Sequence, residues 1–260
     1  MKIAVSGKGG VGKTFVAGTA AWLFARQGQR VLAIDADSSP NLGIFLGLSP
    51  EEAGSILPLS ENQELIALKT GTGYPGVYSL TFSVEDIVER YAVRTPSGVD
   101  LLVMGTVASM GSGCTCAANA VLRALLRHVA VQRDEAVILD MEGGVEHLGR
   151  GTADRVDVML VVTDANVRSL HAARKIARLS AGAGIRRTAI LANMIEDADQ
   201  ARAVREYASV NGLECIGQVP FDRTVREAGI RGTTIFPDAD SPAIRALERI
   251  LDRLKGMPEA

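Results

Sequence analysis

The clearest chemistry in the sequence lies near its start, in a glycine-rich run that holds two lysines. Residues 7–14 read Gly-Lys-Gly-Gly-Val-Gly-Lys-Thr and fit the phosphate-loop pattern G-x-x-x-x-G-K-[ST]. Glycines let the backbone turn tightly, so that successive N–H groups point at phosphate oxygens. Lys13 should bridge the β- and γ-phosphates of a nucleotide, and the Thr14 hydroxyl should ligate Mg²⁺. The residues expected to contact the nucleotide here are Gly7, Lys8, Gly9, Gly10, Val11, Gly12, Lys13 and Thr14.

Carboxylates follow two apolar runs farther along the chain. Asp35 and Asp37 follow residues 30–34, and Asp140 follows three aliphatic residues. A buried carboxylate is costly without a cation nearby, and water-mediated Mg²⁺ would supply one for Asp140. Asp35 is equally consistent with a structural role, in which its carboxylate caps the next segment.

Two of the three cysteines, Cys114 and Cys116, stand one residue apart before a helical pattern at 120–131. One chain supplies only two thiolates, whereas a tetrahedral metal site takes four, so a two-fold dimer would complete the site. The alternative is two small buried side chains, against which the flanking glycines and serine argue. Cys215, inside an apolar run, is expected in the core.

The elements that must position these residues alternate between apolar runs and helical patterns. This order predicts an α/β fold, with a mostly parallel central β-sheet flanked by helices on both faces. Unalternating apolar runs are typical of strands covered on both sides. We predict a single domain over residues 1–260, with an irregular surface excursion at about 51–98 that has room for one hairpin. Strands are expected at 2–6, 30–34, 101–104, 137–139, 158–162, 188–191 and 216–219, and the main early helix at 13–27.

Composition sets the outer limits on function. The 260 residues are 47% hydrophobic and carry a formal charge of −2, which gives no reason to expect nucleic-acid binding. The N-terminal apolar run is too short for a signal peptide, and no segment approaches a membrane span, so we expect a cytoplasmic protein. The apolar side of the C-terminal helix, from Ile244 to Leu254, is expected to pack in the core rather than on a membrane.

The K-G-G-x-G-K-T loop resembles the deviant P-loop ATPases, which include septum-site and chromosome-partition ATPases of the MinD/ParA class and nitrogenase iron protein. The resemblance implies that Lys8 contacts the nucleotide of a partner subunit, so that ATP sits at a homodimer interface; a solvated loop lysine is the alternative. It also implies that Asp37 positions the attacking water in switch I. Asn41 takes the place of an aspartate near Mg²⁺ in the iron protein. Asp140 and Gly143 match the D-x-x-G of switch II, where the glycine N–H senses the γ-phosphate. His147, farther along switch II, is read as positional rather than catalytic.

The same resemblance assigns the base side of the site. Asn193 follows an apolar run and can pair with the donor and acceptor edge of adenine. Pro220, Phe221 and Asp222 resemble the V-P-x-D loop on the adenine side of the iron protein. Asp222 could instead be only the N-cap of a helix at 223–228.

Around the cysteine pair the resemblance narrows. The runs G-S-G-C-T-C…N-A-V-L-R-A-L-L-R-H and D-M-E-G-G-V-E-H-L-G-R-G-T are similar to the carbon monoxide dehydrogenase maturation ATPases of the CooC type. That family implies an ATP-hydrolysing nickel-insertion factor whose Cys114/Cys116 site is shared across the dimer, with carbon monoxide dehydrogenase as client. The net charge and the C-terminal helix lead us to expect neither nucleic acid nor membrane as a partner. Zn²⁺ also suits four thiolates; it would be tetrahedral, and diamagnetic Ni²⁺ square-planar.

Two other functions stay open at this point. An iron–sulfur electron-transfer ATPase like nitrogenase iron protein would take a cluster cysteine from switch II, and residues 140–152 contain none. A membrane- or nucleoid-positioning ATPase would need a basic amphipathic anchor, whereas the C-terminal helix mixes Arg245, Glu248, Arg249, Asp252 and Arg253 on its polar side.

Overall fold

The strands form because each apolar run is buried on both sides. In β1 the side chains of Ile3 and Val5 enter one hydrophobic core, and Ala4, between them, enters the other. The computed structural model describes residues 1–73, 77–79, 81–106, 115–132, 135–144, 153–236 and 241–256. Its strands are β1 Lys2–Gly7, β2 Val31–Ala36, β3 Val93–Arg94, β4 Asp100–Val103, β5 Ala136–Met141, β6 Val158–Thr163, β7 Thr188–Ile195 and β8 Glu214–Pro220.

These strands make one eight-stranded sheet in the order β3-β4-β2-β5-β1-β6-β7-β8. All neighbours are parallel except β3 and β4, which are antiparallel. The predicted fold class is therefore confirmed. β1 lies at the centre, so the phosphate loop that follows it opens at the carboxyl edge of the sheet, where ligand sites of such folds lie.

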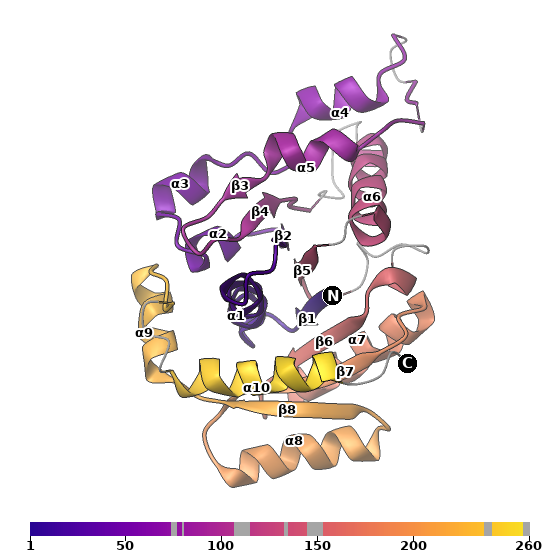
Figure 1. The fold of residues 1–260 in the computed structure, drawn as a ribbon. Helices are drawn as coiled ribbons and strands as arrows, with labels where there is room; N and C mark the ends of the chain where they lie inside the picture. The colour runs from indigo at the N-terminus through magenta and orange to yellow at the C-terminus, as the bar shows by residue number, and fades with distance from the viewer. Residues whose placement is uncertain are drawn as a thin grey trace.

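Helices cover both faces of the sheet (Figure 1). One core lies under α1 and α10, and the other under α6, α7 and α8. As expected, the apolar side of α10 is buried, from Ile244 to Leu254. The helices are α1 Lys13–Arg26, α2 Leu42–Phe45, α3 Pro50–Ser55, α4 Gln63–Thr70, α5 Glu85–Tyr91, α6 Thr115–Gln132, α7 Val167–Ala183, α8 Ala198–Val210, α9 Arg223–Arg231 and α10 Pro242–Gly256, with a 3₁₀ turn at Ala153–Arg155.

Residues 51–98 contain more helix than the irregular surface excursion predicted from sequence. The short helices α3, α4 and α5 lie there, and Gly71 pairs with Tyr78 in an isolated antiparallel bridge. β3 and β4 form an antiparallel pair around the turn at 95–99. No helix in the described part of the chain has the length and apolar character needed to cross a membrane.

Candidate nucleotide-binding site

The phosphate loop connects β1 to α1 with the backbone its glycines allow. Gly10 and Gly12 both have φ of 86°, in the left-handed region that favours glycine. Gly12 is the N-cap of α1, and no side chain caps the helix in the described structure. The first turn also contains no acidic residue. The N–H groups and dipole at the start of α1 are therefore available to an anion.

The two lysines of the loop have opposite environments. Lys13 is only 7% exposed, although it has no carboxylate partner at ion-pair distance within the described residues. A buried, unpaired ammonium needs an anion, and a triphosphate would supply one. Lys8, in contrast, is exposed. Its position allows contact with a group outside its own subunit.

The side chain of Asn193 is hydrogen-bonded to the backbone of the phosphate loop. Its Nδ2 donates to the Val11 carbonyl at 2.8 Å, and the side chain is 3% exposed. A Cβ on Gly12 would lie 2.3 Å from the same nitrogen, so only glycine fits there. Asn193 therefore braces the phosphate loop, a role that the sequence analysis did not predict, and it lies within β7 rather than after a strand.

Asp35 organises the segment that leads to Asp37 and Asn41. Its carboxylate accepts the backbone N–H groups of Asp37 at 3.1 Å, Asn41 at 2.9 Å and Leu42 at 2.9 Å. Burial raises the pKa of Asp35, and these three hydrogen bonds partly offset the rise. This geometry supports the structural alternative for Asp35.

The predicted switch I side chains lie just beyond. Asp37 is half-buried, and its Oδ1 accepts the Ser39 N–H at 3.0 Å. Asn41 is exposed, and its Nδ2 donates to the Ser39 carbonyl at 2.6 Å. The amide oxygen of Asn41 and the second carboxylate oxygen of Asp37 are the atoms left for a ligand or water.

The backbone of Asp35 also reaches toward the cysteine segment. Its carbonyl accepts the N–H groups of Met104 at 2.8 Å and Gly105 at 3.2 Å, directly after β4. The chain then continues toward Cys114, which lies outside the described residues. One residue thus ties switch I to the start of the segment that carries the cysteine pair.

Asp140 lies beside Asp35 in the sheet register and has a different environment. Both carboxylate oxygens are buried, and neither has a partner at hydrogen-bond geometry within the described residues. Burial first, and then the negative charge of Asp35, raise the pKa of Asp140 to about 7, against smaller opposing effects of Thr14 and Lys13. Two orphaned carboxylate oxygens close to a threonine hydroxyl fit Mg²⁺, which prefers oxygen ligands. The residues that would hold the metal are Thr14 and Asp140.

This raised pKa predicts a pH-dependent stability of the nucleotide-free protein. Between the usual value of 3.8 and about 7, Asp140 is protonated in the folded chain and ionised in the unfolded one. The free energy of unfolding should therefore fall as pH rises through this window. The asparagine of Asp140→Asn cannot ionise. The free energy of unfolding of this variant should therefore exceed that of wild type by more than about 1 kcal/mol at pH 8, and by little at pH 4. Urea unfolding in EDTA measures both.

The control for this prediction is Asp252→Asn, the same change on the exposed side of α10. It should leave the pH dependence as in wild type. Parallel wild-type and Asp140→Asn curves from pH 4 to 8 would show that Asp140 does not titrate as described.

The start of the predicted switch II touches the phosphate loop. A Cβ on Gly143 would lie 3.2 Å from the Gly7 carbonyl oxygen. Ser6 Oγ donates to the carbonyls of Glu142 at 3.2 Å and Gly144 at 3.0 Å. These contacts join the start of the predicted switch II to the end of β1 and the first residue of the phosphate loop. His147, also predicted in switch II, lies outside the described residues.

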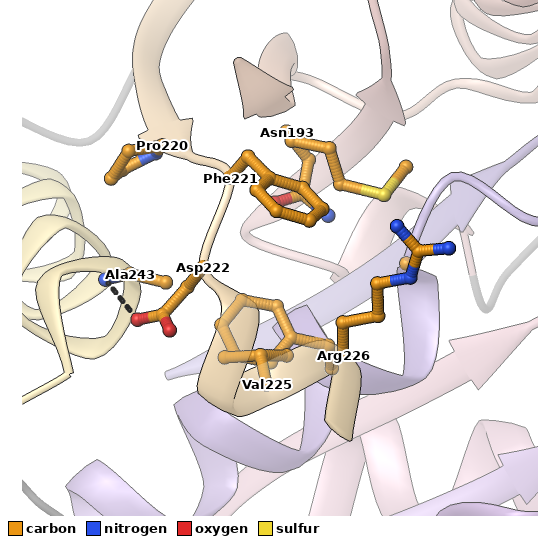
Figure 2. Close-up of a pocket in the computed structure, with 10 residues that line it drawn as sticks. Asn193, Pro220, Phe221, Asp222, Val225, Arg226 and Ala243 are labelled. Atoms are coloured by element: carbon orange, nitrogen blue, oxygen red, sulfur yellow. Dashed lines mark hydrogen bonds between the residues drawn. The ribbon is translucent and has the colours of Figure 1, made fainter. Parts of the chain in front are cut away.

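A cavity of about 320 Å³ opens beside Gly12, near the end of the phosphate loop (Figure 2). It brings together Gly12 and the base-side residues predicted from sequence, from two different strand ends. Its walls are mainly apolar, as a purine would require. The cavity is lined by Gly12, Phe15, Asn193, Met194, Pro220, Phe221, Asp222, Val225, Arg226 and Ala243.

Five of these lining residues were not predicted from sequence to belong to the site: Phe15, Met194, Val225, Arg226 and Ala243. Met194 has φ of 57°, the only non-glycine residue with positive φ in the described chain, and it sits where the β7–β8 register shifts. Such strained positions often mark functional sites. Arg226 extends from α9 and lines the same cavity (Figure 2). Its guanidinium plane suits stacking on a base.

Asp222 lines the cavity, but its carboxylate is used elsewhere. Oδ1 caps α9 by accepting the Thr224 N–H at 2.9 Å, and Oδ2 accepts from Ser241 Oγ at 2.5 Å and Ala243 N at 3.4 Å. Burial acts to raise the pKa of Asp222, but these hydrogen bonds together lower it. The helix-cap alternative for Asp222 is thus confirmed, and Pro220 and Phe221 present the strand end to the cavity.

Only one member of the cysteine pair can be described. Cys116 is exposed with a free thiol in the first turn of α6, and Cys114 lies outside the described residues. The neighbours Ala117 and Ala118 pack against Ile66 of α4. No cluster of three or more metal-binding side chains occurs in the described residues of this single chain. Cys215 is half-buried on β8, so its predicted place in the core was wrong.

The sheet order and the phosphate loop define the class of P-loop ATPases built on a mostly parallel sheet. The solved MinC:MinD cell division complex of Aquifex aeolicus shares this fold: the match has a TM-score of 0.71 at 22% identity and covers 98% of this chain and 96% of that one.

The chain belongs to the CobQ/CobB/MinD/ParA nucleotide binding domain family, which it matches over residues 2–235. It is 39% identical to an uncharacterized ATP-binding protein of Methanocaldococcus jannaschii, over 97% of this chain and 96% of that protein. It is 36% identical to the carbon monoxide dehydrogenase accessory protein CooC of Rhodospirillum rubrum, over 98% of this chain and 97% of that protein.

Proposed function

We propose that this ATPase is an accessory protein that binds nickel through Cys114 and Cys116 at a dimer interface and delivers it to carbon monoxide dehydrogenase. The observation that carries the proposal is the near full-length similarity to the Rhodospirillum rubrum accessory protein, in a chain that also has this cysteine pair. The exposed thiol of Cys116 supports it, because a thiolate must be accessible to accept and release a metal ion.

In this proposal the nucleotide extends from the phosphate loop into the cavity beside Gly12. The triphosphate accepts hydrogen bonds from the backbone N–H groups of residues 9–14 and from the Lys13 ammonium. Adenine enters the cavity beside Asn193 and Phe221. Thr14 and Asp140 would hold Mg²⁺, which would supply positive charge to the β- and γ-phosphates. Asp37 orients the attacking water with the oxygen that Ser39 does not use.

The nickel ion is the cargo, and ATP sets the dimer geometry that holds it. Four thiolates, two from each chain, make the site, so any change in how the chains face each other changes the metal's ligands. The hydrogen bonds from Met104 and Gly105 to Asp35 support a mechanical link between the nucleotide and the cysteine segment. Hydrolysis would then alter the metal affinity without any contact between ATP and nickel.

The experiment that tests the proposal is nickel transfer in a purified system. Protein loaded with one Ni²⁺ per dimer should activate nickel-free carbon monoxide dehydrogenase when ATP is added, and free Ni²⁺ at the same concentration should activate it less. Equal activation by free Ni²⁺, or bound iron in place of nickel after anaerobic purification, would contradict the proposed function.

Lys8→Ala should separate nucleotide binding from dimerisation. Lys8 is exposed, and no hydrogen bond or ion pair joins its side chain to the described residues of its own subunit, so the single chain should bind ATP within about threefold of wild type. Across a dimer interface, loss of a lysine–phosphate pair should weaken association about tenfold or more. Light scattering with a non-hydrolysable ATP analogue measures this, and unchanged association would remove Lys8 from the interface.

A further inference from the structure

The outer edge of β8 lies in an open groove. β8 ends the sheet and is paired only with β7 in the described structure. Figure 1 shows α10 along one side of β8 and α8 along the other. A cavity of about 720 Å³ follows the strand between these two helices. An edge strand leaves a row of unpaired N–H and C=O groups, which can accept another extended chain.

Three arginines line this groove, and none of them has an acidic partner among the residues that the structure describes. Arg205 comes from α8, and Arg249 and Arg253 come from α10; all are exposed. No ion pair joins any of them to a carboxylate within the described residues. The nearby Glu214 does not neutralise them, because the Arg187 guanidinium already binds its carboxylate at 2.7 and 3.2 Å.

Two of the arginines are placed beside the middle of β8, at Gly217 and Gln218. Arg205 Nη1 donates to Gln218 Oε1 at 2.9 Å, and Arg253 Nη2 lies 3.5 Å from where a Cβ of Gly217 would be. Because Gly217 has no side chain, Ile250 of α10 can approach the strand closely. The positive charge is thus held directly beside the open backbone of the strand.

The groove is negatively charged near the carboxyl end of β8. Glu196 and Asp197 line it just beyond β7, where Ile195 is in register with Pro220. A uniform polyanion such as duplex DNA would be repelled at this end. A peptide avoids the conflict when its acidic residues face the arginines and a single cation faces Glu196 and Asp197.

We infer that the β8 edge binds an extended acidic segment of a partner protein, which adds to the sheet as a further strand. Backbone hydrogen bonds to β8 provide the pairing, and Arg205, Arg249 and Arg253 select for carboxylates. A second copy of this chain does not fit as the occupant, because two β8 edges brought together would place their arginine clusters face to face. No residue of the phosphate loop lines this groove, and Pro220 lines both the groove and the base-side cavity.

The test uses two fluorescein-labelled peptides, Glu-Val-Glu-Val-Glu-Val-Gly-Lys and its reverse sequence, with the full-length protein at low salt. Fluorescence anisotropy should show that one of them binds. The double variant Arg249→Glu/Arg253→Glu should bind it about tenfold more weakly or worse. The matched control, Arg123→Glu/Arg127→Glu, makes the same charge change at the same spacing on the exposed side of α6 and should bind as wild type does.

A third peptide separates strand addition from simple charge attraction. N-methylation at alternate residues removes backbone donors but keeps every charge, so it should abolish binding. The inference is overturned if neither peptide binds, if the α6 control loses as much affinity, or if the N-methylated peptide binds equally well. Competition by duplex DNA at equal charge, or self-association through β8, would overturn it as well.

Discussion

Lys13→Ala should lower the kcat/KM for ATP hydrolysis by about a thousandfold or more, the largest effect expected of any single substitution in this chain. The buried ammonium of Lys13 is the cation that the described residues place inside the phosphate loop. Alanine removes both the charge that holds the β- and γ-phosphates and the charge that stabilises their transition state. Phosphate release and nucleotide titration together measure the loss.

The control for this variant is Lys175→Ala, which removes an exposed lysine from α7. It should hydrolyse ATP at the wild-type rate. Circular dichroism should show that Lys13→Ala is folded, since a buried, unpaired charge is removed rather than created. Near-normal hydrolysis by the folded variant would show that nucleotide does not bind at this loop.

Replacing both Cys114 and Cys116 by serine should reduce bound metal from about one ion per two chains to almost none. Serine is close to cysteine in size but does not supply the thiolate that Ni²⁺ or Zn²⁺ requires. The affinity of the single chain for ATP should stay within about twofold of wild type, because the pair is not part of the phosphate loop. Elemental analysis after anaerobic purification, with and without ATP, measures the metal.

The third cysteine provides the matched control. Cys215→Ser makes the same chemical change on β8 and should keep the full metal content. Metal retained in the Cys114/Cys116 double variant, or lost equally in Cys215→Ser, would contradict the proposed thiolate site.

The sequence contained the information for the sheet and for the phosphate loop, because both depend on local patterns. Seven apolar runs became strands within a few residues of their predicted bounds. The short helices of residues 51–98 were missed, although α3 begins with a capping box between Ser49 and Glu52. That signal was readable, since Ser-Pro-Glu-Glu is a typical helix start.

The rest of the site depends on contacts between distant residues. The hydrogen bond from Asn193 to Val11 joins residues 182 apart, and no local pattern indicates it. The left-handed backbone of Met194 coincides with the register shift between β7 and β8, which depends on the pairing of two distant segments. Cys215 was misplaced for the same reason: its apolar surroundings suggested a core strand, but β8 is at the edge of the sheet.

The mass of the purified protein in solution tests the central claim most directly. Sedimentation equilibrium with a non-hydrolysable ATP analogue, Mg²⁺ and Ni²⁺ should give the mass of two chains, and Lys8→Ala should shift it toward one. A single-chain mass under every combination of nucleotide and metal would contradict the account, because one chain cannot complete the four-thiolate site.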